Sequence, residues 1–215
     1  KKELNQLKGG EYTVKTIVTT ELIKDIAEKN HIICYDVYTG FKWIADVIRK
    51  EGGEKFIGGG EESFGYMPGA FTRDKDGVSA TSLMAEIAAW VKMQNKTLYS
   101  FLKEIYAKYG FSQERMIYIV RKGLSGAQEI KAMMEELRHN TPKEINHSPV
   151  VLKKDYLSLE ATNLQTGEKT HLNFETKSDV LQFFLADSSK ISVRPSGTEP
   201  KIKFYFEARA QMKDM

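Results

Sequence analysis

The 215-residue chain has little cysteine, little histidine and no long apolar run, and each shortage excludes a class of protein. Its one cysteine, Cys34, excludes an internal disulfide, which fits a reducing cytoplasm, and the apolar neighbours of Cys34 predict a buried structural thiol. The four histidines lack the spacing of a zinc site. No segment is long and apolar enough to span a membrane, and no signal peptide is visible, so the sequence predicts a cytoplasmic protein.

A strong charge of one sign is also absent. The 32 basic and 29 acidic residues leave a net charge of +3, and the basic residues form no block, so nucleic acid is not an expected partner. The hydrophobic content of 41% and the charged content of 28% predict a soluble, globular chain with one large or two ordinary domains. The chain begins with lysine, and residues 207–215 have the pattern of a helix cut short. We therefore expect a piece of a longer protein.

Strand-like and helix-like patterns alternate in the first half of the chain. Strands are expected at residues 12–18, 31–35 and 56–57, and helices after the first two strands and at 78–94 and 97–109. Thr20 is the expected N-cap of the first helix, and Thr97 that of the last. The second helix carries an apolar face at i, i+3, i+4, i+7 spacing, made of Phe41, Ile44, Ala45 and Ile48. This alternation predicts an α/β domain with a largely parallel sheet over residues 1–111.

The second half is rich in strands and has one helix. Strands are expected at residues 115–121, 149–154, 157–162, 169–174, 180–185, 190–193 and 202–207. A capping box at 125–128 is expected to begin the helix, whose buried stripe comprises Ile130, Met133, Met134 and Leu137. One helix among antiparallel strands predicts an α+β domain over residues 112–215.

Residues 194–201, RPSGTEPK, lie between two of the expected strands. A loop of this composition offers a guanidinium fork, two hydroxyls, an ammonium and a glycine N–H that a ligand can approach closely. These groups hold a phosphate monoester well. The alternative is a solvated hairpin turn, because proline, serine and glycine all favour turns. The octapeptide by itself supports both interpretations equally.

Residues 58–65, GGGEESFG, predict a flexible loop at the carboxyl end of a strand. The segment lacks the lysine of a Walker loop, the third glycine of a dinucleotide fingerprint and the first glycine of a serine-hydrolase elbow. Its carboxylates and hydroxyl suit a polyol, since one pair of acceptors can bridge adjacent sugar hydroxyls. A solvated acidic turn is the alternative, and these residues alone favour it slightly.

Two shorter segments also carry candidate groups. In residues 73–77, RDKDG, Asp76 can cap the helix that follows, and Lys75 is either a surface charge or, beside a phosphate, an electrophile or general acid. In residues 39–42, TGFK, a hydroxyl and a glycine precede a helix, where an anion or a sugar oxygen can bind.

Taken in order, these four segments resemble the C-terminal half of the α-D-phosphohexomutases, the phosphoglucomutase/phosphomannomutase superfamily. TGFK resembles the family's TG-aromatic-K loop, GEESFG its sugar-binding loop, RDKDG its R-D/E-K-D-G segment and RPSGTEPK its phosphate-binding loop. The resemblance covers nearly the whole chain. It implies the third domain of this four-domain family, an α/β layer, followed by the fourth, an α+β domain of the TATA-binding-protein-like type.

The resemblance also implies a mechanism and residue roles. A phosphoserine in the first domain gives its phosphoryl group to a hexose phosphate, glucose 1,6-bisphosphate forms and turns around, and Mg²⁺ in the second domain assists. Lys75 would act near the transferred phosphate. The sugar would be bound by Thr39, Gly40, Glu61, Ser63 and Arg73. The phosphate that is not reacting would be held by Arg194, Ser196, Gly197, Thr198 and Lys201.

Some family features are missing from this sequence. It has neither the phosphoserine motif nor the aspartate-rich metal loop, so the isolated chain is expected to be inactive without N-terminal domains. Phe64 and Gly65 replace residues of dual-specificity phosphomannomutases, which favours glucose, although mannose and glucosamine stay open. Tyr205 stands where some relatives have a second phosphate-binding arginine, which leaves Lys201 or Lys203 as the replacement. A complete, non-catalytic module that binds sugar phosphates is the alternative.

Overall fold

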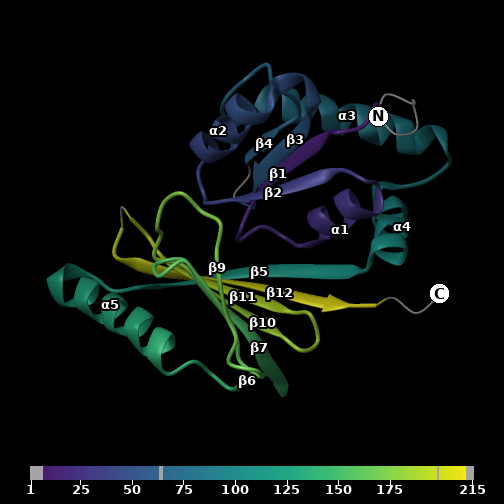
Figure 1. Cartoon of the computed structure of the whole chain (residues 1–215). Coiled ribbons are helices and arrows are strands. Elements are labelled where there is room, and N and C mark those ends of the chain that lie inside the picture. Colours follow the sequence, from purple (N-terminus) through teal and green to yellow (C-terminus); the bar gives the residue numbers. More distant parts are fainter. Residues whose placement is uncertain (1–6, 63–64, 198, 212–215) are drawn as a thin grey trace. The chain divides into compact units, whose positions relative to one another are not determined.

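A computed structural model describes residues 7–62, 65–197 and 199–211 of the chain. These residues form two compact units, one covering the chain up to Phe111 together with Gln211 and the other covering Ser112–Ala210 (Figure 1). Each unit has its own sheet and its own apolar core.

The first unit is an α/β layer. Its elements are β1 (Tyr12–Thr16), α1 (Leu22–Lys29), β2 (Ile33–Val37), α2 (Phe41–Glu51), a short 3-10 helix (Gly53–Lys55), β3 (Phe56–Glu61), β4 (Gly65–Met67), α3 (Gly77–Met93) and α4 (Leu98–Tyr109). The strand order is β2-β1-β3-β4, with β1 parallel to β2 and β3, and β4 antiparallel to β3. The predicted, largely parallel α/β fold is confirmed.

Helices α1 and α2 cover opposite faces of this sheet (Figure 1). The chain steps from β1 to β2 and then back across β1 to β3, and right-handed crossovers place the two helices on different faces. The predicted apolar face of α2 is confirmed, because Phe41, Ile44 and Ile48 are buried. They pack on Tyr12 and Val14 of β1. The carboxyl ends of β1, β2 and β3 meet at one edge of the sheet.

Helix boundaries in the first unit follow the predicted capping residues closely. Asp76 accepts a hydrogen bond from the Val78 N–H, and Thr97 forms a capping box with Ser100. The first helix differs from the prediction, since its N-cap is Glu21. The Thr20 hydroxyl nevertheless accepts a hydrogen bond from the Leu22 N–H at 3.2 Å. It therefore still satisfies a backbone N–H in the first turn of α1.

The flexible loop predicted from Gly58 onward is wrong in its first part. Gly58, Gly59 and Gly60 belong to β3 and pair with β1. A Cβ atom on Gly59 would lie 2.6 Å from the carbonyl oxygen of Val14, and one on Gly60 would lie 2.6 Å from that of Gly65. The glycines therefore permit close packing within the sheet and do not mark a loop.

The second unit is an α+β layer. Its elements are β5 (Phe111–Val120), α5 (Gly123–His139), β6 (Glu144–Ile145), β7 (Ser148–Asp155), β8 (Glu160–Asn163), β9 (Lys169–His171), β10 (Leu181–Leu185), β11 (Lys190–Pro195) and β12 (Lys201–Ala210). The order is β5-β12-β11-β10-β7-β8-β9, and β6 pairs with β7. Neighbours from β12 to β9 are antiparallel, which confirms the predicted fold class.

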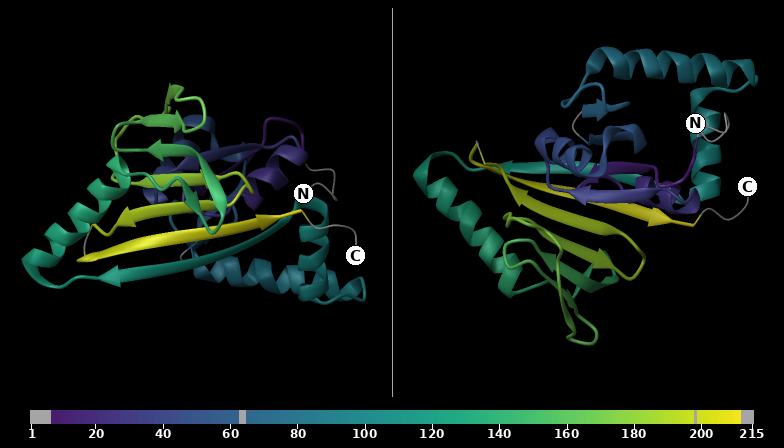
Figure 2. Two further views of the ribbon diagram at one scale, coloured as in Figure 1. Left: turned by 90° about the horizontal axis from the view of Figure 1, so that it is seen from below. Right: turned by 45° about the horizontal axis from the view of Figure 1, so that its top comes forward.

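Helix α5 packs on one face of the second sheet (Figures 1 and 2). Its predicted stripe is confirmed: Ile130 and Met134 are buried, and Met133 and Leu137 pack against the same core. The predicted capping box is wrong, because α5 begins at Gly123. A Cβ atom on Gly126 would lie 2.2 Å from the carbonyl oxygen of Arg121, so this glycine belongs to a tightly packed first turn.

The helix predicted from residue 207 is also wrong where the structure describes it. Residues 207–210 continue β12, because Glu207 pairs with Lys190 of β11 in the antiparallel ladder. Long-range pairing therefore overrides the local helical pattern. The last residues of that expected helix, 212–215, lie outside the described part of the chain. Of the helices that the structure describes, none combines the length and apolar character of a membrane span.

Candidate functional site

Two of the sequence segments meet at the carboxyl edge of the first sheet. Glu61 is the last residue of β3, and Gly40 is the N-cap of α2. The Gly40 N–H donates a hydrogen bond to Oε1 of Glu61. Gly40 has φ +122°, a conformation that favours glycine, so the chain turns here in a way that aims its N–H at the carboxylate. Thr39 directly precedes this residue and is partly exposed.

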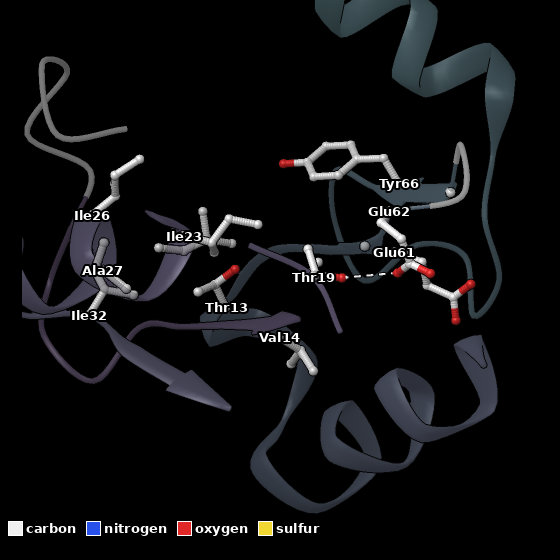
Figure 3. Close-up of a pocket in the computed structure, with 14 residues that line it drawn as sticks. Thr13, Val14, Thr19, Ile23, Ile26, Ala27, Ile32, Glu61, Glu62 and Tyr66 are labelled. Atoms are coloured by element: carbon white, nitrogen blue, oxygen red, sulfur yellow. Dashed lines mark hydrogen bonds between the residues drawn. The ribbon is translucent and has the colours of Figure 1, made fainter. Parts of the chain in front are cut away.

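The adjacent Glu62 is held by hydroxyls that the sequence reasoning missed. Oε2 of Glu62 accepts hydrogen bonds from Thr16 and Thr19, each at 3.3 Å, and the two hydroxyls lie 2.8 Å apart. Both threonines are buried at the end of β1, and Figure 3 shows the contact from Thr19. The only available signal was their position after a predicted parallel strand, whose end shares an edge with Glu62.

A buried ion-pair network lies near the same edge. Lys15 is fully buried, and its ammonium lies 2.7 Å from Oδ1 of Asp36 and 3.0 Å from Oε1 of Glu21. Burial by itself would lower the pKa of Lys15, but the charges of Asp36 and Glu21 raise that pKa above its ordinary value. The signal for this pair was a lysine inside one expected strand, residues 12–18, and an aspartate directly after the next, residues 31–35.

Cys34 shares this environment and is less enclosed than predicted. The thiol is free and only half-buried. Burial raises its pKa to about 12, opposed in part by the charge of Lys15. Cys34 is therefore a poor nucleophile at neutral pH.

Lys75 lies beside Gly65, the first residue of β4. A Cβ atom on Gly65 would lie 3.6 Å from Cβ of Lys75, and the ammonium lies 5.6 Å from the ring centroid of Phe41 in α2. The Lys75 side chain is 60% exposed and its ammonium lies 3.2 Å from Oδ1 of Asp74. The pKa of Asp74 is lowered first by the backbone N–H of Lys75 and then by its side chain.

The structure does not bring all of the predicted sugar-binding residues together. Nη2 of Arg73 lies 3.9 Å from where a Cβ atom on Gly53 would stand. Gly53 precedes β3, whereas Glu61 ends it, so Arg73 lies toward the other end of that strand. Ser63 lies outside the described residues.

A cavity of about 530 Å³ extends from the two glutamates along α1 (Figure 3). One end is polar and includes Thr19, Glu61 and Glu62, whereas the remainder is mainly apolar. The apolar part is lined by Ile23, Ile26, Ala27, Ile32, Ile57 and Tyr66. The polar end is the part that can bind hydroxyl groups.

The RPSGTEPK segment runs from the end of β11, through the connection, to the first residue of β12 in the second unit. The Ser196 N–H donates to the Lys201 carbonyl at 2.8 Å, and the Arg121 N–H donates to the Pro200 carbonyl at 2.9 Å. These bonds close the loop and attach it to the end of β5. Gly197 is exposed, and a Cβ atom there would meet nothing within 4 Å. Thr198 lies outside the described residues.

The charged residues of this loop have different surroundings. The Lys201 ammonium forms an ion pair with Glu199, whose pKa is lowered chiefly by that bond. Arg194 lies in β11, opposite Lys203 of β12, and its side chain is partly exposed. Among the residues that the structure describes, no group of three or more His, Cys, Asp and Glu is arranged to hold a metal ion.

Comparison with known families accounts for both units. The model described as phosphoglucomutase/phosphomannomutase, alpha/beta/alpha domain III, matches residues 1–109. The chain belongs to the phosphoglucomutase/phosphomannomutase family. The model of the C-terminal domain of phosphoglucomutase/phosphomannomutase matches residues 128–215, so the resemblance seen in the sequence is confirmed.

Known relatives of this phosphoglucomutase/phosphomannomutase chain are longer. A phosphoglucomutase of Staphylococcus aureus strain bovine RF122 / ET3-1 is 37% identical over 193 residues, which are 89% of this chain and 35% of that protein. The phosphoglucomutase of strain MSSA476 is 36% identical over 199 residues, which are 92% of this chain and 36% of that protein. The chain therefore spans about a third of the length of these relatives.

Solved structures share the fold. The open form of pp63/parafusin, a phosphoglucomutase from Paramecium, superposes with a TM-score of 0.66 at 20% identity, covering 94% of this chain and 34% of that one. A candidate phosphomannomutase from Thermus thermophilus gives a TM-score of 0.59 at 17% identity, covering 94% and 33%. At these identities the likeness concerns the fold alone.

Proposed function

We propose that this chain is the sugar- and phosphate-binding part of a phosphohexomutase. Such an enzyme moves phosphate between C1 and C6 of a hexose phosphate, and we propose glucose as the hexose. The hydrogen bond from Gly40 to Glu61 is the observation that carries the proposal, because it joins two separate segments into one polar site. Family membership and the name phosphoglucomutase among relatives at 36–37% identity support it.

Glu61 is the proposed ligand of the sugar. The bond from Gly40 orients the Glu61 carboxylate. An ionised carboxylate can accept about four hydrogen bonds, which suits it to bind sugar hydroxyls. Thr39 and Gly40 would line the same place, together with Ser63. We assign no sugar contact to Arg73, because its guanidinium lies toward the other end of β3.

Lys75 is the proposed catalytic cation. Its ammonium is exposed and pairs with Asp74 at the surface, where a long, flexible side chain exchanges partners readily. An incoming phosphoryl group would draw the ammonium from Asp74, and Lys75 would then stabilise negative charge that develops during transfer or donate a proton. Its place beside Gly65 supports this role.

The loop of residues 194–201 is the proposed holder of the phosphate that does not react. Arg194 would supply a charged, bidentate donor, and Ser196, Gly197, Thr198 and Lys201 would supply the other donors. Phosphoryl transfer relies mainly on positioning and charge stabilisation, which these residues would provide. The phosphoserine and Mg²⁺ would belong to domains outside this chain, so the chain alone would bind glucose 1,6-bisphosphate without turning it over.

Activity of a longer polypeptide tests this proposal. The chain would be extended by the coding sequence upstream of it and assayed for conversion of glucose 1-phosphate to glucose 6-phosphate. Glu61→Gln is expected to lower turnover and leave the melting temperature unchanged, because it removes a charge at the very end of β3 and leaves an acceptor for Gly40. Absence of mutase activity in the extended wild-type protein, or full activity of the variant, would contradict the proposal.

A further inference from the structure

Two adjacent acidic residues at the end of β3 are held by different parts of the first unit. Glu61 is the last residue of β3 and accepts a hydrogen bond from the Gly40 N–H at the start of α2. Oε2 of Glu62 lies 3.3 Å from the hydroxyls of both Thr16 and Thr19, which precede α1. Successive side chains of a strand point to opposite faces, and α1 and α2 cover opposite faces of this sheet (Figure 1). The two carboxylates therefore hold the end of β3 from two sides.

The support of Glu62 comes from the buried centre of the sheet. Strand β1 lies between β2 and β3, and Thr16 is its last residue. Thr16 and Thr19 are buried, and their hydroxyls lie 2.8 Å apart, so two hydroxyl hydrogens serve three contacts. Every arrangement that uses both hydrogens within this cluster directs at least one of them to Glu62. A hydrogen bond to an ionised carboxylate is stronger than one between neutral groups, which favours such an arrangement.

The hydrogen bond between Gly40 and Glu61 has to reach past the end of β1. Gly40 follows β2, whereas Glu61 ends β3, and β1 separates these two strands. After Glu61 the chain turns at once into β4, whose first residue, Gly65, pairs with Glu61. If the end of β3 moved away from β1, the Glu61 carboxylate would move away from the Gly40 N–H. The contacts of Glu62 with Thr16 and Thr19 oppose that movement.

We propose that Glu62 is a positioning residue of the sugar site, which keeps the Glu61 carboxylate on the Gly40 N–H by binding Thr16 and Thr19. The link from Glu62 to sugar binding rests on the proposed function, whereas the link from Glu62 to Gly40 is independent of it. A carboxylate that is already held in place loses less conformational entropy when it binds the hydroxyls of a hexose. In this assignment Glu62 acts through Glu61 and does not contact the sugar.

Hydrogen exchange of the Gly40 amide tests the first link without any ligand. Glu62→Met keeps the length of an exposed side chain and removes the acceptor of the threonine hydroxyls. Exchange of the Gly40 N–H, measured by NMR, should become about 2–10 times faster, as expected for the loss of one hydrogen bond. Glu62→Gln removes the same charge but keeps an acceptor oxygen, so its exchange rate should stay near that of wild type.

Glu54→Met is the matched control. Glu54 is also an exposed acidic residue, but it lies in the 3-10 helix before β3, at the other end of that strand from Glu61. This variant should leave the exchange of the Gly40 N–H unchanged. Equal exchange rates in wild type, Glu62→Met and Glu54→Met would overturn the positioning role.

A double-mutant comparison identifies the contact through which Glu62 acts. Thr19→Val should also accelerate exchange of the Gly40 N–H, and the combination with Glu62→Met should exchange no faster than the faster single variant, because both changes break the same contact. Thr19→Ala serves if the valine variant does not fold. Effects on the logarithm of the rate that add fully would overturn the assignment, since Glu62 and Thr19 would then act independently.

Titration with glucose 1-phosphate tests the second link. Glu62→Met should bind this ligand about 2–10 times more weakly than wild type, and Glu62→Gln should bind it nearly as well as wild type. If Glu62→Gln loses as much affinity as Glu62→Met while the Gly40 amide is unchanged, Glu62 binds the ligand directly and the positioning role is overturned. If wild type does not bind glucose 1-phosphate but the exchange of Gly40 responds as expected, the proposed sugar site fails and the control of Gly40 by Glu62 is upheld.

Discussion

The backbone N–H of Gly40 donates a hydrogen bond to Oε1 of Glu61, although the two residues are separated by 21 positions. Both residues lie at the carboxyl edge of the sheet. Gly40 is the N-cap of α2, which follows β2, and Glu61 is the last residue of β3. Parallel pairing through β1 places both strand ends together. The bond therefore depends on the fold as a whole and fixes one acidic side chain at the place where α/β sheets bind ligands.

Gly40→Ala tests this bond. The neighbouring side chains leave ordinary van der Waals space for a methyl group, so the cost comes from the backbone, whose φ of +122° an alanine adopts only with strain. We expect a loss of about 1–3 kcal/mol in the free energy of unfolding, together with weaker binding of glucose 1-phosphate. Denaturant unfolding and NMR titration measure the two effects.

Gly167→Ala is the matched control for that variant. Gly167 also has positive φ, at +75°, with nothing within 4 Å of the added Cβ, but it belongs to the turn between β8 and β9. Gly167→Ala should lower the free energy of unfolding without changing the affinity for glucose 1-phosphate. Equal affinity of both variants for glucose 1-phosphate would show that the Gly40 bond is unrelated to binding.

Thr19→Val tests the support of Glu62. The substitution keeps the shape of the side chain and removes the hydroxyl that bonds Glu62 and Thr16. A buried partner is lost, so the free energy of unfolding should fall by about 1–3 kcal/mol. Urea denaturation gives this value, and Thr19→Ser should restore most of it. A serine variant as unstable as the valine variant would indicate that packing of the methyl group, and not the hydroxyl, is what matters.

Lys15→Met tests the buried ion-pair network. Removing the cation leaves Asp36 and Glu21 without it, and breaking a buried pair typically costs about 3–5 kcal/mol. Urea denaturation at neutral pH measures the loss. Lys24→Met is a suitable control, because Lys24 is exposed and reaches Glu28 only at 3.9 Å. A stability change no larger than that of the control would refute the importance of the network.

Because of Lys15, we also expect the free energy of unfolding to depend on pH. Its pKa is raised in the folded chain, so its contribution to stability is complete below the ordinary lysine pKa of about 10.4 and is lost as the pH rises through the higher folded pKa. Unfolding curves between neutral pH and pH values above that ordinary pKa should therefore show an alkaline loss in wild type. The part due to Lys15 should be missing from Lys15→Met. Parallel profiles for the two proteins would contradict this linkage.

Local patterns in the sequence predict the helices well. The spacing of Phe41, Ile44 and Ile48 marks the buried face of α2, and Thr97 caps α4, because both depend on residues within a few positions. The prediction of a loop at Gly58–Gly60 is wrong because these glycines allow carbonyl oxygens of neighbouring strands to approach closely, and such contacts are not visible in the local sequence. The strand at residues 207–210 was missed for the same reason, since its partner is β11.

The candidate site is predictable only in part. The sequence identifies Glu61 and Arg194 through their motifs, but it does not contain the contacts that support them. The bond from Gly40 to Glu61, the hydroxyls of Thr16 and Thr19 on Glu62, and the register that places Lys203 opposite Arg194 all arise from pairing between distant strands. Such neighbours cannot be derived from spacing along the chain.

Binding of glucose 1,6-bisphosphate to the isolated chain tests the central claim most directly. In a titration followed by NMR, the amide signals of Gly40 and Glu61 in the first unit, and of Ser196 and Gly197 in the second, should shift and saturate with ligand. Arg194→Ala should weaken the binding by about 1.5–3 kcal/mol, the range for charged hydrogen bonds. Unchanged signals at all four residues would contradict the account.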